Sequence, residues 1–286
     1  MRMNREMATP KKKRDLKYSP HLITYIDILG FRELVKEKPP NFISRAIRRV
    51  METTAPDKRI RKVNEENYIK FSDLIIHTVP ILSAANKKFR EGIVFLEIQS
   101  LALAQAALVE EGLLLRGALT IGMLERSYGV LFGPGIISAY DLERAEAQFP
   151  RIVVDSELIG ALKLNPLLRS HEYKQEMEFV SKYIKRDDDG VIFIDYLGGV
   201  QDEAGEDYLG FLRTHKRLVE GNMVNFKHNK RVLSKYLWLM KYHNAVVQAH
   251  CTTELHEELA VIGPEAASDV PLLLSRPLRQ PDEESH

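Results

Sequence analysis

The sequence predicts an α+β fold, in which short apolar strands are separated by amphipathic helices. Three observations support this: β-branched runs end at turn residues, helical patterns lie between them, and the chain becomes helical throughout after about residue 205. The succession of elements is a split βαβ pattern of the ferredoxin-like kind. We therefore expect a ferredoxin-like core followed by a helical C-terminal extension.

The first half of the chain begins with a basic stretch, residues 1–19, which we interpret as a flexible arm. His21–Asp27 (HLITYID) is short and rich in β-branched residues, so it predicts a buried strand that turns at Gly30 into a helix. Pro39 and Pro40 end that helix because proline cannot continue it. The next expected elements are a helix over Asn41–Thr54, a strand over Tyr68–Val79, and a long helix from Ser83 to about Glu111.

The second half continues the alternation and then changes character. Asp155 is expected to cap a short helix. Strands are expected over Leu113–Gly122, Tyr128–Phe132, Arg151–Val154 and Gly190–Leu197, and helices over Ile136–Ala147, Tyr208–Gly221 and Phe226–Thr252. The domain prediction is an arm over 1–19, a main domain over 20–200, a helical extension over 205–262 and a disordered tail over 263–286.

Composition excludes several classes of protein. The longest apolar stretch, Leu101–Leu115, is interrupted by Gln105 and two glutamates, so no membrane insertion is expected. The single cysteine, Cys251, rules out an intrachain disulfide and suits a reducing cytoplasm. The 41 basic and 40 acidic residues give a net charge of +1, so no overall field attracts a polyanion and nucleic acid is not an expected partner.

Two aspartates stand in unusual apolar surroundings. Asp27 ends a buried apolar strand, and Asp73 lies within Phe71–Ile76 (FSDLII). A buried carboxylate must be paired, bind a metal or stay protonated, because burying a bare charge is costly. Two such aspartates on neighbouring strands would suit magnesium or manganese, which prefer oxygen ligands. The alternative is that one caps a turn and the other faces water.

Four motifs, in order, resemble the class III nucleotidyl cyclases. They are Tyr25–Phe31 (YIDILGF), Ser72-Asp73, Arg116–Gly122 (RGALTIG) and Phe132–Glu143. The resemblance covers roughly residues 21–197, and Ala118 replaces the first glycine of the family's glycine-rich strand. It implies a class III cyclase core, in which a nucleoside triphosphate is closed into a cyclic monophosphate.

The resemblance also implies roles for individual residues. Asp27, Asp73 and the backbone carbonyl of Ile28 would hold two Mn²⁺ or Mg²⁺ ions, which activate the ribose 3′-hydroxyl and neutralise the triphosphate. Backbone amides of Gly30 and Phe31 would meet the phosphates. Arg116 would bind phosphate oxygens through two nitrogens of its planar guanidinium group. The alternative is that Arg116 is an ordinary surface arginine on a strand. Class III sites form between two subunits, so a homodimer is implied.

The departures from the family pattern bear on specificity. The positions that read adenine are Ile69 and Val130 here, and two apolar residues cannot supply the required donor and acceptor. The family's transition-state Asn and Arg fall on Ile137 and Asp141. The bacterial pyrimidine cyclases of the Pycsar anti-phage systems differ in a similar way. We therefore expect UTP or CTP as substrate and a separate effector that responds to the cyclic product.

Other interpretations remain open from the sequence. The chain could be an inactive cyclase-like module for nucleotide sensing or dimerisation, and a diguanylate cyclase or polymerase fragment is disfavoured because no GGDEF-type signature is present. Lys182, Lys185 and Arg186 either reach phosphates or form a solvated face. His77 is expected to be a satisfied core or edge residue and not a metal ligand.

Overall fold

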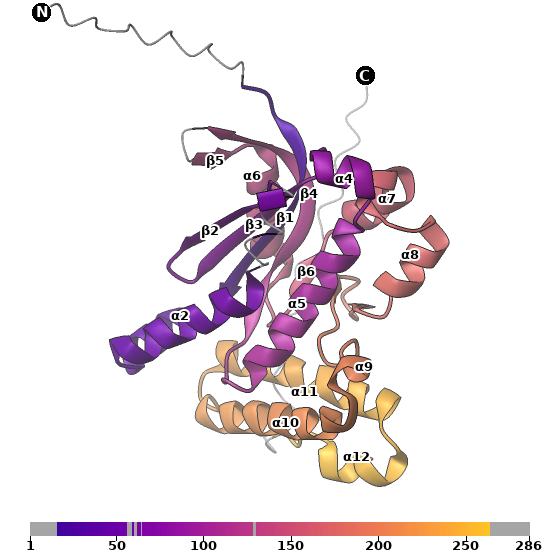
Figure 1. Cartoon of the computed structure of the whole chain (residues 1–286). Helices are drawn as coiled ribbons and strands as arrows, with labels where there is room; N and C mark the ends of the chain where they lie inside the picture. The colour runs from indigo at the N-terminus through magenta and orange to yellow at the C-terminus, as the bar shows by residue number, and fades with distance from the viewer. Residues whose placement is uncertain (1–15, 56–58, 60–61, 64, 128–129, 264–286) are drawn as a thin grey trace, which may run out of the picture.

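The computed structural model describes residues 16–263, except 56–58, 60–61, 64 and 128–129. It contains a mixed sheet with helices on both faces, and further helices close one end of the sheet (Figure 1). The strand order is β2-β3-β1-β4-β6-β8-β7, with β5 paired to β4. Most of the predicted arm and all but one residue of the predicted tail lie outside the described residues.

The centre of the sheet has the predicted ferredoxin-like arrangement. β1 (Ser19–Ile28) is antiparallel to both β3 (Leu74–Pro80) and β4 (Leu115–Ser127), and β2 (Asn67–Phe71) pairs antiparallel with β3. The order β2-β3-β1-β4, with helices joining β1 to β2 and β3 to β4, is that of a split βαβ fold. The predicted fold class is therefore confirmed.

Alternation along β1 assigns its side chains to two faces. Leu22, Ile26 and Ile28 belong to the main core, whereas Ile23 packs in a smaller cluster on the opposite face. Because successive side chains of a strand point to opposite faces, Asp27 lies on the same face as Ile23. The smaller cluster, and not the main core, is therefore the neighbour of the Asp27 carboxylate.

Two sequence predictions were wrong in the same way, since each merged two elements into one. Tyr68–Val79 is not a single strand but a hairpin, in which Ser72 adopts a left-handed φ of 58° between β2 and β3. The expected long helix from Ser83 is divided into α4 (Ala84–Phe89) and α5 (Ile93–Val109). The break falls where Arg90 and Gly92 have positive φ, which ends a helix.

Helices cover the two faces of the sheet differently. On one face, α2 (Pro40–Thr54) and α5 contribute Val50, Ile98 and Leu101 to the main core, and the short α1 (Phe31–Glu37) precedes α2. On the other face, α6 (Pro134–Glu146) packs on β1 and β4. The approach is close, because a Cβ on Gly122 would lie 2.4 Å from the Gly135 Cα. The glycine pair therefore fixes α6 near the sheet.

The far edge of the sheet is built from short strands, some of which the sequence did not predict. The Asp155 side chain accepts a hydrogen bond from the Glu157 backbone amide, as predicted for a helix cap. The predicted strand Gly190–Leu197 is shorter, and β7 and α8 were not foreseen. The elements are β5 (Val130–Phe132), β6 (Ile152–Val154), β7 (Ile184–Arg186), β8 (Ile192–Ile194), α7 (Ser156–Leu164), η1 (Pro166–Leu168), α8 (Tyr173–Val180), α9 (Gln201–Ala204) and η2 (Gly205–Asp207).

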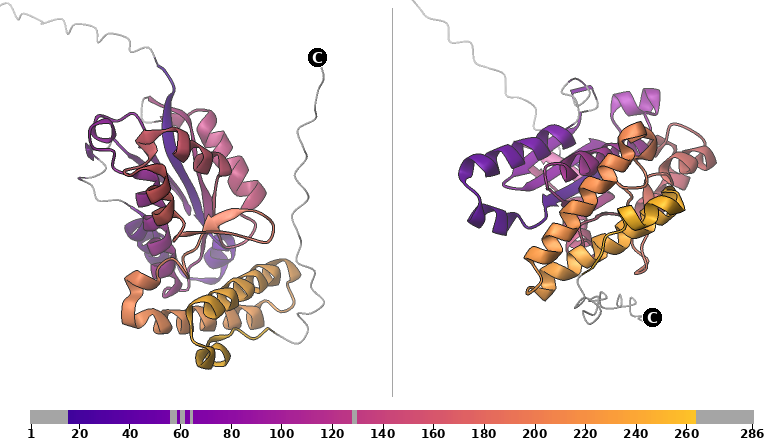
Figure 2. Two further views of the ribbon diagram at one scale, coloured as in Figure 1. Left: turned by 90° about the vertical axis from the view of Figure 1, so that its right-hand side faces the viewer. Right: turned by 90° about the horizontal axis from the view of Figure 1, so that it is seen from below.

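The C-terminal helices close one end of the sheet, as both views in Figure 2 show. They are α10 (Tyr208–Asn225), α11 (Lys230–His250) and α12 (Thr253–Leu259). Leu212 and Leu239 belong to the same core as the sheet, so the boundary near residue 205 marks no separate core. Among the described helices, none combines the length and apolar character needed to cross a bilayer.

Candidate active site

The central feature of the candidate site is an ion pair between neighbouring strands. Asp27 on β1 lies directly opposite Arg116 on β4. The Arg116 Nε and Nη2 atoms donate to the two carboxylate oxygens of Asp27 at 2.9 and 2.8 Å. The side chains are 20% and 31% exposed, so the pair is partly shielded from water. The structure thus brings together two residues that the sequence predicted to belong to one site.

A third charged group, Glu143 on α6, reaches the same pair. Its Oε1 lies 3.0 Å from the Arg116 Nη2, although the angle does not make a hydrogen bond. Glu143 is 5% exposed, and burial raises the pKa of its carboxyl, with Asp27 raising it further and Arg116 lowering it. Sequence reasoning missed Glu143 as a site residue, though its place one turn after buried Ala139 on α6 was a possible signal.

The sequence pattern placed Asp73 inside a strand, but it lies in the turn between β2 and β3. It is half-buried, and burial raises the pKa of its carboxyl, with the Asp27 charge raising it further. Arg116 acts in the opposite direction. The charge of Asp27 therefore acts on the Asp73 carboxyl.

A cavity of about 600 Å³ opens beside Asp27, Arg116 and Glu143. Its size is in the range of small-molecule sites. Its wall is completed by Tyr25 of β1 and by residues of α6, of the segment after α6 and of α11, which are Tyr140, Arg144, Gln148, Phe149, Arg231, Ser234 and Lys235. Helix α11 of the predicted C-terminal extension thus contributes directly to the site.

The charge of this cavity favours an anion. Arg116, Arg144, Arg231 and Lys235 supply four cations, against the two carboxylates of Asp27 and Glu143, so the lining carries a net charge of +2. Within the described part of the chain, Arg144, Arg231 and Lys235 form no salt bridge. Burial, and then Arg116 and Arg231, lower the pKa of Lys235, which an incoming anion would reverse.

The remaining predicted site residues are at the end of β1. The side chain of Ile28 is buried in the core, so only its backbone can approach the site. Gly30 precedes α1 with a φ of 75°, and Phe31 packs against the main core. Helix α1 has only seven residues, which weakens the expectation that its dipole binds phosphate.

The positions at which the sequence departs from the class III pattern lie mainly on surfaces. Ile137 on α6 is 64% exposed and Val130 on β5 is 60% exposed, while Asp141 is also exposed. Ile69 is half-buried in β2. The structure therefore offers no donor–acceptor pair for adenine at Ile69 and Val130.

His77, as predicted, is a satisfied core residue. Its ring nitrogens lie 3.0 Å from a Glu97 oxygen and 3.2 Å from a Glu66 oxygen. Although burial lowers the pKa of His77, the two carboxylates raise it to about 10. The imidazolium is thus part of a buried ion cluster.

The residues present fit a divalent ion that arrives with a nucleotide better than a preformed metal centre. Within the described residues, no cluster of three or more His, Cys, Asp or Glu side chains could hold a metal. Magnesium, however, is commonly bound by one or two carboxylates together with substrate phosphates. Asp27 and Asp73 supply two carboxylates, and burial together with the Asp27 charge raises the pKa of Asp73. The Arg116 fork on Asp27 is the group with which such an ion would compete.

No family model and no curated protein matches this chain. Among solved structures, a bacterial light-regulated adenylyl cyclase is similar at 18% identity and a TM-score of 0.36, covering 48% of this chain and 76% of that one. The guanylyl cyclase domain of the RhoGC fusion protein from the aquatic fungus Blastocladiella emersonii is similar at 10% identity and a TM-score of 0.40, covering 63% and 98%. Likeness at this level decides neither fold nor activity.

Proposed function

We propose that the chain is a pyrimidine nucleotide cyclase that converts UTP or CTP to the 3′,5′-cyclic monophosphate and pyrophosphate. The observation that supports the proposal is that Asp27 and Arg116 line one cavity of net positive charge, while the charge of Asp27 acts on the Asp73 carboxyl. The sequence motifs that resemble class III cyclases contain these same three residues. The pyrimidine preference rests on Ile69 and Val130, which cannot pair with a purine as lysine and aspartate do.

The reaction requires the ribose 3′-oxygen to attack the α-phosphorus of the same nucleotide. A new P–O bond forms, the bond to the bridging oxygen of the β-phosphate breaks, pyrophosphate leaves, and the 3′-hydroxyl proton passes to water. The protein's contribution is to hold the chain of phosphates so that the 3′-oxygen meets the α-phosphorus in line.

The cationic residues of the cavity perform this positioning. Arg116 can grip phosphate oxygens with the same fork that holds Asp27, because carboxylate and phosphate present similar oxygen pairs. Lys235 and Arg231 of α11 and Arg144 of α6 offer further charges to the triphosphate. Glu143 faces Arg116 and keeps the guanidinium oriented when phosphate draws it from Asp27.

Divalent ions would be held by Asp27, Asp73 and the Ile28 carbonyl. When bound, Mn²⁺ or Mg²⁺ lowers the pKa of the 3′-hydroxyl and neutralises the leaving pyrophosphate. We propose two such ions for each site.

A homodimer is part of the proposal. Helix α6 exposes Ile137 and Tyr140, three residues apart and hence on one helical face, and Tyr140 also lines the cavity. A second copy of the chain would cover this apolar face beside the site and supply groups in place of the missing Asn and Arg. By the same resemblance, we propose that the protein acts in the cytoplasm, where the cyclic product activates a separate effector in anti-phage defence.

A second candidate function has one observation in its favour. Both carboxylate oxygens of Asp27 are bonded to Arg116, so a metal must displace or share with the guanidinium. If that displacement does not occur, the chain is a catalytically inactive cyclase-like module that senses nucleotides or mediates dimerisation.

The test is to incubate the purified chain with each of the four ribonucleoside triphosphates and Mn²⁺, and to identify products by mass spectrometry. We expect cyclic UMP or cyclic CMP from the wild type and at least a hundredfold less from Asp73→Asn. The matched control is Asp202→Asn, because the Asp202 side chain is 83% exposed and lies outside the cavity. Nucleotide binding without any cyclic product from the wild type would favour the inactive module instead.

A further inference from the structure

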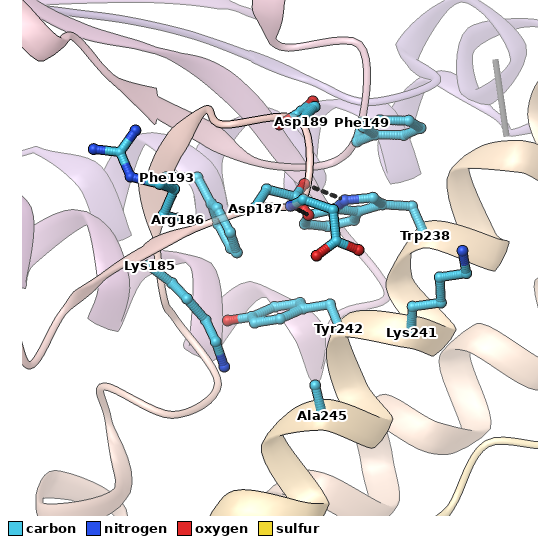
Figure 3. A pocket seen from close by; sticks show the side chains of 11 residues that line it. Phe149, Lys185, Arg186, Asp187, Asp189, Phe193, Trp238, Lys241, Tyr242 and Ala245 are labelled. Atoms are coloured by element: carbon cyan, nitrogen blue, oxygen red, sulfur yellow. Dashed lines mark hydrogen bonds between the residues drawn. The ribbon is translucent and has the colours of Figure 1, made fainter. Parts of the chain in front are cut away.

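A second cavity, of about 180 Å³, lies between the β7–β8 turn and α11. Its walls are aromatic: Phe193 of β8 and Trp238 and Tyr242 of α11, with Phe149 beside them. Figure 3 shows these rings around the opening, with Lys185 on one side and Lys241 on the other. We call this cavity the aromatic pocket. Its volume suits a single ring and not a whole nucleoside triphosphate.

The walls of the aromatic pocket are rigidly held. The Trp238 Nε1 donates a hydrogen bond to Asp187 Oδ2 at 2.6 Å, the dashed line in Figure 3. The buried Arg151 forms salt bridges to Asp187 and to Asp189. Phe193 meets Trp238 at 70° and Tyr242 at 82°, so these rings form a corner and do not stack on one another. The corner is preformed, which lowers the entropic cost of binding a flat ring.

The charges at the rim indicate the sign of the ligand. Arg151 binds both Asp187 and Asp189, so its single positive charge offsets one of their two negative charges. Within the part of the chain that the structure describes, neither Lys185 nor Lys241 has a carboxylate within ion-pairing distance. Arg186 adds a third cation, so Lys185, Arg186, Lys241 and Arg151 supply four positive charges against the three carboxylates of Asp187, Asp188 and Asp189. The net charge around the pocket is therefore +1, and the two lysines at its mouth have no carboxylate partner.

We propose that the aromatic pocket binds a small planar aromatic ring that bears one anionic group. The ring enters the corner formed by Phe193, Trp238 and Tyr242, and the anionic group remains at the mouth between Lys185 and Lys241. Aromatic carboxylates and pyrimidine nucleoside monophosphates share this chemistry. The site is separate from the cavity at Asp27, and the two cavities meet only at Phe149, which lines both and stacks on Trp238 at 5.5 Å.

The chain offers a direct reporter of this pocket, because Trp238 is its single tryptophan. Intrinsic fluorescence excited at the red edge of tryptophan absorption is followed while benzoate or its neutral isostere benzamide is added. Uridine monophosphate and uridine form a second matched pair, which distinguishes a simple aromatic acid from a nucleotide. We expect saturable quenching by at least one anion, with at least tenfold weaker binding of its neutral partner.

Variants locate the binding. In the Lys185→Ala/Lys241→Ala protein we expect the anion to bind about tenfold more weakly, while Lys182→Ala, an exposed lysine outside the pocket, binds as the wild type does. Lys235→Ala should leave the quenching unchanged, because Lys235 lines the other cavity. If the double variant does not fold, the affinity of the wild type must still fall as sodium chloride is raised from 50 to 500 mM.

Three results would overturn the proposal. These are equal binding of anion and neutral partner in both matched pairs, no saturable quenching by any of the four probes up to millimolar concentration, and loss of quenching in Lys235→Ala but not in the lysine double variant. Saturable quenching by choline in place of the anions would also overturn it, since aromatic walls can equally hold a quaternary ammonium group.

Discussion

Replacing Arg116 with methionine removes the cation that Asp27 and Glu143 share. The variant keeps the aliphatic bulk but leaves two shielded carboxylates, 20% and 6% exposed, without the guanidinium that lies within 3.0 Å of both. Breaking a fully buried pair costs about 3–5 kcal/mol, and an exposed pair contributes about 0–1 kcal/mol. The intermediate exposure here predicts a loss of about 2 kcal/mol at pH 7.5.

The loss should depend on pH in a defined direction. Burial already raises the pKa of Glu143, and removing Arg116 removes the group that lowers it. A carboxyl whose folded pKa exceeds its unfolded value favours folding below the unfolded pKa, and that contribution disappears as pH rises through the folded pKa. The difference in the free energy of unfolding between wild type and Arg116→Met should therefore reach its full value at pH 7.5 and be nearly absent at pH 4.5.

Urea denaturation at the two pH values measures this, with Arg213→Met as the matched control. Arg213 pairs with Glu258 on the surface, where the side chains are 47% and 51% exposed, so its loss should cost less than about 0.5 kcal/mol. Equal costs for the two variants, or a cost for Arg116→Met that does not change with pH, would refute the reasoning.

Three further predictions concern stability. His215 and His243 are buried, stacked and 3.0 Å apart at their Nδ1 atoms, and burial lowers the pKa of both. Their contribution to the free energy of unfolding is present above about pH 6.5 and is lost as pH falls, by about 1.4 kcal/mol per pH unit for each proton taken up on unfolding. The free energy of unfolding of His215→Leu, measured by urea titration, should therefore depend less steeply on pH. His77→Leu leaves the Glu97 carboxylate without its imidazolium and should lower the free energy of unfolding by about 3 kcal/mol, measured by urea denaturation at pH 7. Because the pKa of His77 is raised to about 10, its stabilising contribution in the wild type is full below about pH 6.5 and declines as pH rises toward 10. A cost below about 1 kcal/mol would contradict the charged cluster. Gly122→Ala should cost about 3 kcal/mol of stability in thermal or urea unfolding, because its Cβ would clash with the α6 backbone. In the control Gly160→Ala on α7, the new Cβ meets nothing within 4 Å, so that variant should be neutral or stabilising. Equal effects of the two variants would contradict the close approach of α6.

The fold could be predicted from the sequence where local patterns are unambiguous. The β-branched run before Asp27 and the prolines at 39 and 40 predicted β1 and the break between α1 and α2. The residue pattern over Tyr68–Val79 missed the β2–β3 turn because Ser72 and Asp73 are neither glycine nor proline, and Ser72 adopts its left-handed φ within the hairpin. The unforeseen β7 has only three residues, which is too few for a periodicity to appear.

The candidate site could be predicted only in its strand-borne part. Asp27 and Arg116 were marked by a charge at the end of an apolar strand and by a motif, and the register of β1 with β4 places them opposite each other. Glu143 and Lys235 were not predicted as site residues, because a charged residue on an amphipathic helix normally faces solvent. Their place in the cavity depends on how α6 and α11 pack on the sheet, which the sequence pattern does not specify.

The central claim is that Asp27 and Asp73 together bind a divalent ion with the nucleotide. Its most direct test is electron paramagnetic resonance of Mn²⁺ titrated into the chain with a non-cyclisable UTP analogue lacking the 3′-hydroxyl. The account predicts about two bound ions per site in the wild type, and loss of that binding in Asp27→Asn and in Asp73→Asn. Mn²⁺ binding that persists unchanged when both aspartates are replaced would contradict it.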